Sequence, residues 1–198
     1  MPDQNRFEKQ LDFIGEIDKV KEIYRQTYLV SGSRKENDAE HSWHLAVMAA
    51  LFSEYAPAGT DMVKVVKMVL IHDLVEIDAG DTYLFDEVGT RDKAERETKA
   101  AERIFGILPE DQNREFHEYW REFEDGKTSE AKFALVMDRF QPFYHNWMTR
   151  GISWIEHDVK RSQVLSRMEP ALKDYPPFYN YMIEKVEEAV KSGWLLPS

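Results

Sequence analysis

The chain has 198 residues, 42% of them hydrophobic and 13% aromatic, which is enough material for one domain with a substantial core. Its formal net charge of −11 opposes binding to a nucleic-acid polymer but allows a small phosphorylated ligand at a locally positive site. Cysteine is absent, which excludes disulfides, thiolate catalysis and cysteine-ligated zinc. No segment is apolar enough for a signal peptide or a membrane span, so we expect a cytoplasmic protein that does not bind membranes.

Nearly every segment has helical periodicity, and none alternates convincingly as a strand. The predicted helices cover, in chain order, residues 4–28, a segment from about 38 to 57–59, 61–77, 91–105, a short segment from 109, a segment from 128 or 129 past 138, 152–168 and 178–191. Asp61 and Thr128 or Ser129 are the expected N-caps, Pro142 should kink or end its helix, and Gly193 should stop the final one. We therefore predict an all-α, single-domain helical bundle over residues 1–198, with the helices of 152–191 packed on the rest.

A histidine and an aspartate stand side by side in the apolar segment MVLIHDLVEIDAGD, as His72 and Asp73. Burying either group without a partner costs on the order of several kcal/mol, so both must find a polar partner inside the fold. A core histidine beside an Arg-paired aspartate would meet this need. A metal ion would meet it as well.

Two further polar residues lie in segments predicted to face inward. His41 shares a helical stripe with Leu45 and Met48, and Asp138 lies within the apolar run FALVMDRF. Three helices would thus each bring a metal-binding residue type into the interior. Two imidazoles and two carboxylates suit one divalent ion of manganese, cobalt, magnesium, iron, nickel or zinc, and an octahedral shell would leave about two positions open for water and phosphate.

The three segments ENDAEHSWHLAVMA, LIHDLVEIDAGD and LVMDRFQP resemble the HD superfamily of metal-dependent phosphohydrolases. The sequence is similar, more narrowly, to the branch that contains bacterial 5′-deoxynucleotidases and related hydrolases, over about Ile17 to Asp138. The resemblance implies a helical bundle of the HD-domain type. It also implies that His41, His72, Asp73 and Asp138 are the metal ligands.

The other histidines have weaker support as ligands. His44 could nearly share a helix face with His41, but the resemblance places the ligand at His41, so we expect His44 to pack beside the site. His117, His145 and His157 are expected in ordinary helical surroundings. One metal ion is therefore favoured over two.

Two acids follow the His72-Asp73 pair at short offsets. Glu76 lies four residues after His72 and therefore on the same side of a helix, although a solvated acid near a helix end is the plain alternative. In the family branch the matching Glu and Asp belong to the active site. We therefore assign Glu76 to orienting or deprotonating the attacking water, and Asp81 to holding a second water or protonating the leaving group.

A phosphate monoester needs positive charge beyond the metal ion. Arg25 and Arg34 match arginines of the deoxynucleotidase branch, Arg25 with a one-residue gap, and guanidinium groups suit phosphate. A surface salt bridge is the alternative for Arg25, and Arg139 is expected to be structural. Gln26 stands where the deoxynucleotidases have a Trp, which puts a preference for deoxyribose in doubt.

Two remaining patterns are interpreted without a direct role in chemistry. The aromatic side chains of the C-terminal half are expected to pack in the core rather than to stack on a nucleobase; they are Trp120, Phe140, Phe143, Tyr144, Trp147 and Trp154. The charged segment from Arg91 to Glu102 is expected to be a solvated face or the rim of a homodimer.

These observations predict an enzyme that hydrolyses a small phosphate monoester, in the first place a nucleoside or deoxynucleoside 5′-monophosphate. Two alternatives stay open at this point. The same site could act on a triphosphate, a cyclic nucleotide or a signalling nucleotide. The protein could also be a nucleotide-binding or metal-binding regulator without turnover.

Overall fold

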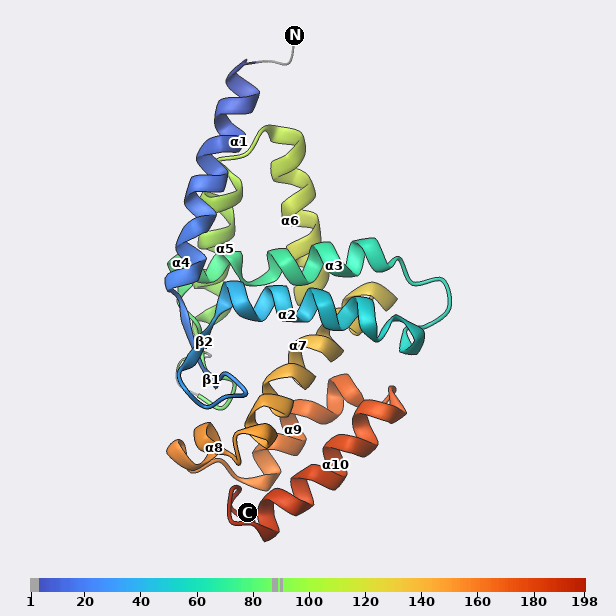
Figure 1. Ribbon diagram of the computed structural model, residues 1–198. Helices are drawn as coiled ribbons and strands as arrows, with labels where there is room; N and C mark the ends of the chain where they lie inside the picture. The colour runs from blue at the N-terminus through green and yellow to red at the C-terminus, as the bar shows by residue number, and fades with distance from the viewer. Residues whose placement is uncertain (1–3, 87–88, 90) are drawn as a thin grey trace.

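The computed structural model describes residues 4–86, 89 and 91–198, and most of the described chain is helical (Figure 1). The α-helices are α1 (Gln4–Ile17), α2 (Asp38–Leu51), α3 (Met62–Ile71), α4 (Glu76–Ala79), α5 (Lys93–Phe105), α6 (Glu110–Asp125), α7 (Ser129–Met148), α8 (Ile152–Glu156), α9 (Arg161–Leu172) and α10 (Pro176–Lys191). Short 3-10 helices lie at η1 (Asp18–Glu22), η2 (Ser53–Tyr55) and η3 (His72–Val75), and the described strands are β1 (Tyr24–Tyr28) and β2 (Lys35–Asn37). The prediction of an all-α fold is confirmed. Within the described chain, no helix combines the length and the apolar character that crossing a membrane requires.

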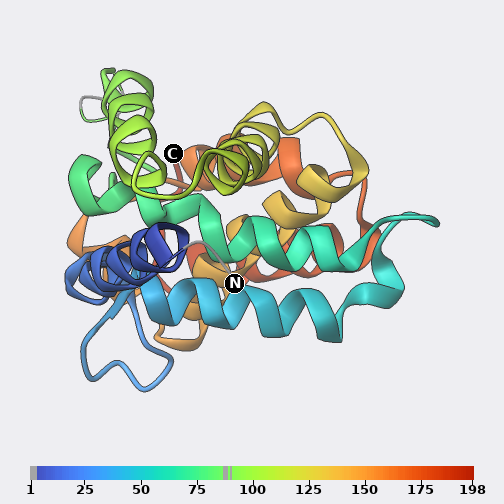
Figure 2. The ribbon, with the colours of Figure 1, turned by 90° about the horizontal axis from the view of Figure 1, so that it is seen from above.

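The helices are arranged in three levels along the molecule. α2 and α3 lie side by side across its middle, as both views show (Figures 1 and 2). α1, α5 and α6 extend from this pair toward one end, where the N-terminus lies, and α8, α9 and α10 form the opposite end. α7 runs from the middle pair into the C-terminal helices and so connects the two ends of the fold.

The buried apolar side chains form two clusters. The larger cluster draws on α2, α3, α7, α9 and α10 and includes Leu45, Met68, Met137 and Met182, all fully or almost fully buried. The smaller cluster joins α1, η3, α5 and α6 around Phe105. The expectation that most aromatics of the C-terminal half pack in helical cores is in line with this arrangement, because all six named aromatics belong to, or pack against, one of the two clusters.

The predicted N-terminal helix 4–28 is wrong beyond Ile17, and the expectation of no strand is wrong with it. Residues 24–28 form β1, which pairs antiparallel with β2. The segment YRQTYLV is rich in aromatic and β-branched residues, which fit an extended conformation better than a helix. Gly32, with a φ of +69°, reverses the chain between the strands, a backbone conformation that glycine adopts without steric cost.

Helix starts were predicted more accurately than helix ends. Asp61 accepts hydrogen bonds from the backbone of Val63 and Lys64, and Thr128 accepts one from Ala131, so both predicted N-caps are confirmed. The second helix ends at Leu51, earlier than the predicted 57–59, and is followed by η2. Its start carries a capping box between the side chains of Asn37 and Glu40, which the sequence analysis did not identify.

The predicted continuous helix 61–77 is interrupted at the His72-Asp73 dipeptide. α3 ends at Ile71, the chain tightens into η3, and α4 continues for one turn to Ala79. A 3-10 turn in mid-helix often marks a functional position, because it re-aims side chains relative to a regular α-helix. Here it sets the directions of two predicted metal-binding residues.

Two predictions about the C-terminal half need correction. α7 continues six residues beyond Pro142 to Met148, so of the two predicted effects of this proline, a kink or an end of the helix, the end is wrong. The Asn146 side chain donates a hydrogen bond to the Pro142 carbonyl oxygen at 2.9 Å, within the turn that follows the ring. The predicted helix 152–168 is divided into α8 and α9 by a turn in which Asp158 has a φ of +49°. The stop at Gly193, with a φ of +74°, is as predicted.

Candidate metal centre

Three of the predicted ligands meet in the middle of the fold. His41 comes from α2, His72 from η3 and Asp138 from α7, and all three are buried. Asp138 Oδ1 lies 3.2 Å from His41 Nε2 and 3.6 Å from His72 Nε2. One ligand atom from each residue lies within 4.8 Å of the others, which is close enough for a shared ion.

The fourth predicted ligand, Asp73, lies against the same group. Its Oδ1 is 3.1 Å from His72 Nε2, and its Oδ2 is 3.8 Å from His41 Nε2. The structure therefore brings all four predicted residues together, although they are up to 97 positions apart in the sequence.

The two imidazole rings are oriented in a way that suits metal binding. His72 Nδ1 lies 3.0 Å from the Val69 carbonyl oxygen, to which it can donate, and among the described residues the buried His72 Nε2 has no hydrogen-bond partner. His41 Nδ1 lies 3.1 Å from Gln141 Oε1. In both rings a hydrogen bond donated from Nδ1 leaves the Nε2 lone pair directed at the carboxylates of Asp73 and Asp138. The donor set therefore fits a divalent cation.

The electrostatics of this group also favour a cation. Burial opposes the charged imidazole of His72, but the carboxylates of Asp73 and Asp138 outweigh it and raise its pKa to about 10. Burial likewise opposes the charged form of Asp138, yet Arg139, His41 and His72 lower the pKa of this carboxyl well below its usual value. Carboxylates that stay charged in the interior create a negative potential that attracts a metal ion.

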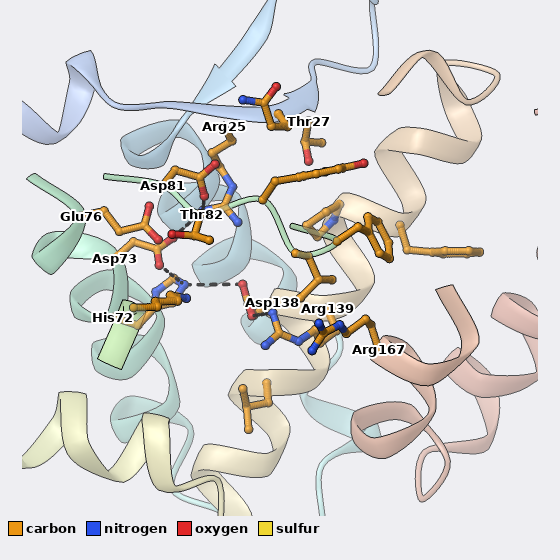
Figure 3. A pocket seen from close by; sticks show the side chains of 18 of the residues that line it. Arg25, Thr27, His72, Asp73, Glu76, Asp81, Thr82, Asp138, Arg139 and Arg167 are labelled. Atoms are coloured by element: carbon orange, nitrogen blue, oxygen red, sulfur yellow. Dashed lines mark hydrogen bonds and ion pairs between the residues drawn. The ribbon is translucent and has the colours of Figure 1, made fainter. Parts of the chain in front are cut away.

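Arg25, at the start of the strand β1, lies among carboxylates next to the proposed ligands (Figure 3). Its Nη1 is 2.8 Å from Asp73 Oδ2, 3.1 Å from Asp38 Oδ1 and 3.7 Å from Asp81 Oδ1. The guanidinium group is thus engaged by three acids at once. Asp38, which the sequence analysis did not single out, is fully buried and part of this network.

The acids around Arg25 hold protons more tightly than usual. Burial, together with the charge of Asp73, raises the pKa of Asp38 to about 6 and raises the pKa of Glu76 well above its ordinary value. Burial also raises the pKa of Asp81, against the opposing effect of Arg25. Carboxyl groups with raised pKa values are typical of catalytic sites, where an acid or base must hold and release a proton.

A cavity of about 240 Å³ opens beside these groups. His72, Asp73, Glu76, Asp81 and Asp138 line one part of it, and apolar side chains from the loop after α4, from α7 and from α8 line another. Figure 3 shows the labelled polar side chains around this space. Both proposed catalytic acids therefore face the same cavity as three of the four proposed metal ligands; His41 does not line it.

The two predicted phosphate-binding arginines lie in different places. Arg25 lines the cavity, whereas Arg34 is exposed and pairs with Glu40. Arg34 Nη1 donates to Glu40 Oε2 at 2.8 Å, and Nη2 donates to Oε1 at 2.5 Å. Arg139, expected to be structural, donates from Nη1 to Asp138 Oδ2 at 2.8 Å and also lines the cavity.

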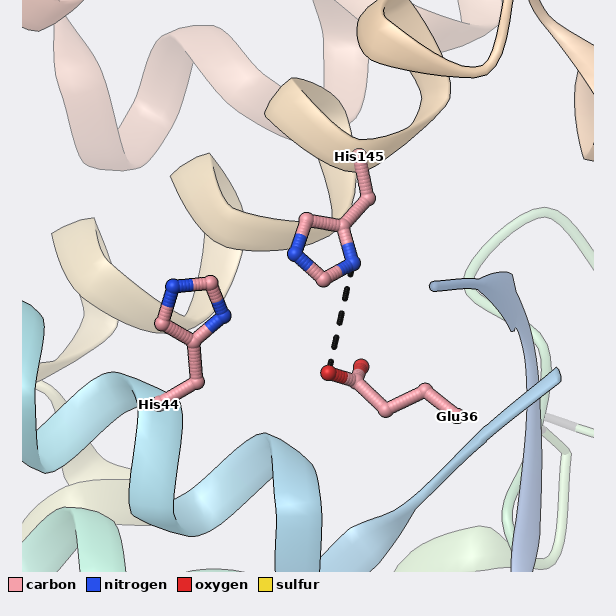
Figure 4. Close-up of side chains that lie close together, drawn as sticks. All are labelled: Glu36, His44 and His145. Carbon is pink, nitrogen blue, oxygen red and sulfur yellow. Dashed lines mark ion pairs between the residues drawn. The ribbon is translucent and has the colours of Figure 1, made fainter. Parts of the chain in front are cut away.

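A second polar group, of which two members are buried and His44 is half-buried, lies on the other side of His41. Glu36 of β2, His44 of α2 and His145 of α7 each offer a ligand atom within 4.8 Å of the others (Figure 4). The Gln141 amide nitrogen lies among them, 2.7 Å from Glu36 Oε1 and 3.3 Å from His44 Nδ1. His44 therefore packs beside the site, as expected, while His145 lies in a buried polar cluster rather than in ordinary helical surroundings.

Several residues of the site were missed by sequence reasoning. Lys93 and Glu97, taken as part of a solvated charged helix, line the cavity with their side chains paired at 3.2 Å. Arg167 reaches the cavity from α9. Glu97 does lie on the same helical face as the core residues Ala101 and Ile104, a signal that could have placed it inward.

These features define a class of helical protein in which a histidine, a His-Asp dipeptide and a second aspartate face one interior site. Comparison with known proteins agrees with this description. The model of the HD domain family matches residues 17–177, and the chain belongs to this family. The 5′-deoxynucleotidase HDDC2 of Homo sapiens is 29% identical over 130 residues, which are 65% of this chain and 62% of that protein. The Bos taurus protein of the same name is 31% identical over 65% of this chain and 62% of its own length. The chain thus spans less than two thirds of these relatives.

Solved structures give a more extensive match. A crystal structure of a "predicted metal-dependent phosphohydrolase" from Magnetospirillum magnetotacticum MS-1 shares 48% identity and superposes with a TM-score of 0.91, covering 98% of this chain and 97% of that one. A conserved hypothetical protein from Pyrococcus furiosus, 23% identical with a TM-score of 0.59, covers 89% of this chain and 99% of its own and shares the fold.

Proposed function

We propose that this protein is a divalent-metal-dependent phosphohydrolase that cleaves a small phosphate monoester, in the first place a nucleoside 5′-monophosphate. One observation carries the proposal: the converged nitrogen and oxygen atoms of His41, His72 and Asp138 lie beside a cavity that also contains proton-holding acids. The names of the relatives support the same chemistry. The cavity volume of about 240 Å³ suits part of a small molecule rather than a polymer.

We assign the metal site to His41, His72, Asp73 and Asp138. A bound divalent ion would supply a Lewis acid for a phosphate oxygen and would lower the pKa of a coordinated water. The metal identity stays open among manganese, cobalt, magnesium, iron, nickel and zinc.

We assign the proton transfers to Glu76 and Asp81. Glu76 is buried, and its raised pKa makes it a base that can take a proton from the attacking water and keep it. Asp81 lines the same cavity from the loop after α4, and a protonated carboxyl there could donate to the leaving oxygen. Burial raises the pKa of Asp81 as well, which favours the protonated form that this role needs.

The apolar part of the cavity is proposed to hold the nucleoside. Tyr83, Phe85 and Phe143 line it, and aromatic rings can pack against a base or a sugar. Gln26 also lines the cavity, so the residue that stands in place of the family's Trp is positioned to affect the choice between ribose and deoxyribose. The roles of Arg25 and Arg34 in binding phosphate, the single-domain organisation, the cytoplasmic location and a homodimer stay predictions.

A substrate-by-metal activity matrix tests the proposal. The protein is first stripped of ions, then supplied with each metal and assayed against nucleoside monophosphates, triphosphates and cyclic nucleotides, with the released product identified. We expect free phosphate from monophosphates only when metal is present. Pyrophosphate or triphosphate as the product would point to another nucleotide substrate. A nucleotide that binds tightly but stays intact would indicate a regulator, and hydrolysis at full rate without metal would refute the proposal.

A further inference from the structure

The cations that line the cavity differ in whether they are free to bind a substrate anion. Arg25 is held by the carboxylates of Asp38, Asp73 and Asp81, and Lys93 Nζ lies 3.2 Å from a carboxylate oxygen of Glu97. Each of these charges is compensated within the protein. An added phosphate would have to compete with carboxylates already in place.

Arg139 and Arg167 are less engaged. Within the part of the chain that the structure describes, Arg139 makes one ion pair, from Nη1 to Asp138 Oδ2 at 2.8 Å, and its side chain remains 32% exposed. Arg167 is exposed and, within residues 4–86, 89 and 91–198, has no ion-pair partner. Both line the cavity, and Figure 3 shows their side chains reaching toward each other on the side of Asp138 that faces away from Glu76.

Two arginines that face the same part of a cavity are unusual in a chain with a net charge of −11. Two guanidinium groups that face the same space repel each other. The single negative charge of Asp138 does not neutralise both of them, and its Oδ1 faces the two histidines. An anion with several oxygens placed between the arginines would relieve the repulsion. Phosphate matches guanidinium groups through paired, charge-assisted hydrogen bonds.

We propose that Arg139 and Arg167 form the binding site for the phosphate group of the substrate, next to the metal centre. Arg25, in this arrangement, neutralises the buried carboxylates and does not contact the phosphate. The site would take a phosphate monoester or inorganic phosphate. The inference rests on the proposed function for its substrate, but anion binding can be measured without turnover.

The test compares Arg167→Gln with Arg161→Gln in the metal-loaded protein. Both arginines lie on α9, but Arg161 pairs with Glu187 of α10 and does not line the cavity. Calorimetric titration with inorganic phosphate gives the Kd, and steady-state kinetics give KM and kcat. We expect Arg167→Gln to raise the Kd for phosphate and the KM by about tenfold, since a charge-assisted hydrogen bond is lost. Arg161→Gln should leave both unchanged.

A second variant addresses Arg139, which also contacts a proposed metal ligand. Arg139→Lys keeps the positive charge but loses the planar pair of donors, and we expect weaker phosphate binding at unchanged metal affinity. The metal Kd is measured in parallel for every variant. This separates lost anion contacts from a disturbed metal site.

The outcomes distinguish this inference from the proposed function. Phosphate binding that depends on Arg167, in a protein that hydrolyses no monoester, would support the site and refute the function. Monoester hydrolysis with the same KM and phosphate Kd in Arg167→Gln would overturn the site and leave the function intact. Failure of the unaltered, metal-loaded protein to bind phosphate would overturn the site as well.

Discussion

Replacing Arg25 by glutamine should destabilise the metal-free protein strongly at neutral pH. The guanidinium group is the shared cation of Asp38, Asp73 and Asp81, and its side chain is only 14% exposed. Removing one partner of a buried ion pair typically costs about 3–5 kcal/mol, because an uncompensated charge is left in the interior. Three carboxylates lose their cation together here, so we expect the free energy of unfolding to fall by about 3 kcal/mol or more.

The penalty should depend on pH in a defined direction. The pKa of Asp38 is raised by burial to about 6 in the folded protein, above its value of roughly 3.9 in an unfolded chain. A carboxyl with a raised folded pKa stabilises the fold when it is protonated, so stability is gained as the pH falls through 6. Without Arg25 these carboxyls should take up protons even more readily. The difference between the variant and the unaltered protein should therefore shrink between pH 7 and pH 5.

Urea denaturation of ion-stripped protein at both pH values measures this effect. Arg34→Gln is the matched control, because Arg34 pairs with Glu40 at the exposed surface and should matter much less. Equal stability of the two variants at pH 7 would refute the assignment of Arg25 as the cation that holds the buried acids together. A penalty that stays constant down to pH 5 would refute the electrostatic explanation.

Three further outcomes follow from the site. His41→Ala and Asp73→Ala should each abolish metal-dependent hydrolysis while circular dichroism still shows most of the helix content; activity that survives in both would remove these residues from the metal site. Metal affinity, followed by calorimetry, should rise by roughly tenfold per pH unit at pH values below about 10, because the ion must displace the proton that the raised pKa of about 10 keeps on His72; an affinity that does not change with pH would contradict this. Gln141→Leu should weaken metal binding by about 10–100-fold, since His41 Nδ1 loses the oxygen that orients its ring; an unchanged metal Kd would show that the ring needs no such support.

The part of the site that could be predicted is the part whose chemistry conflicts with its local sequence. His72 and Asp73 interrupt an apolar segment, and Asp138 lies in another. Each is therefore expected to be a buried polar group that requires a partner, even without knowledge of the fold. The helix starts at Asp61 and Thr128 were predictable for a similar reason, because the capping interaction is made within a few residues.

The rest depends on contacts between distant segments. Residues 24–28 become a strand because β2 supplies the pairing partner, and no helical or strand periodicity within the segment itself could reveal this. Gln141 acquires its role only when α7 crosses α2 and meets His41, which lies 100 residues earlier. Arg167 comes from α9, beyond Asp138, where the resemblance noted in the sequence analysis ends, and an exposed arginine has no local signal to distinguish it from the others.

The proposed ligands do not belong to one hydrophobic cluster. His41 and Asp138 lie on helices of the larger cluster, whereas the neighbours of His72 and Asp73 in η3 pack into the smaller one. A cation bound by all four would therefore link the two clusters, in addition to α3 and α6, which contribute buried side chains to both. Its binding would stabilise the fold by roughly 4 kcal/mol at a free concentration of about a thousand times its Kd. Removing the ion with a chelator should lower the free energy of unfolding by the same amount.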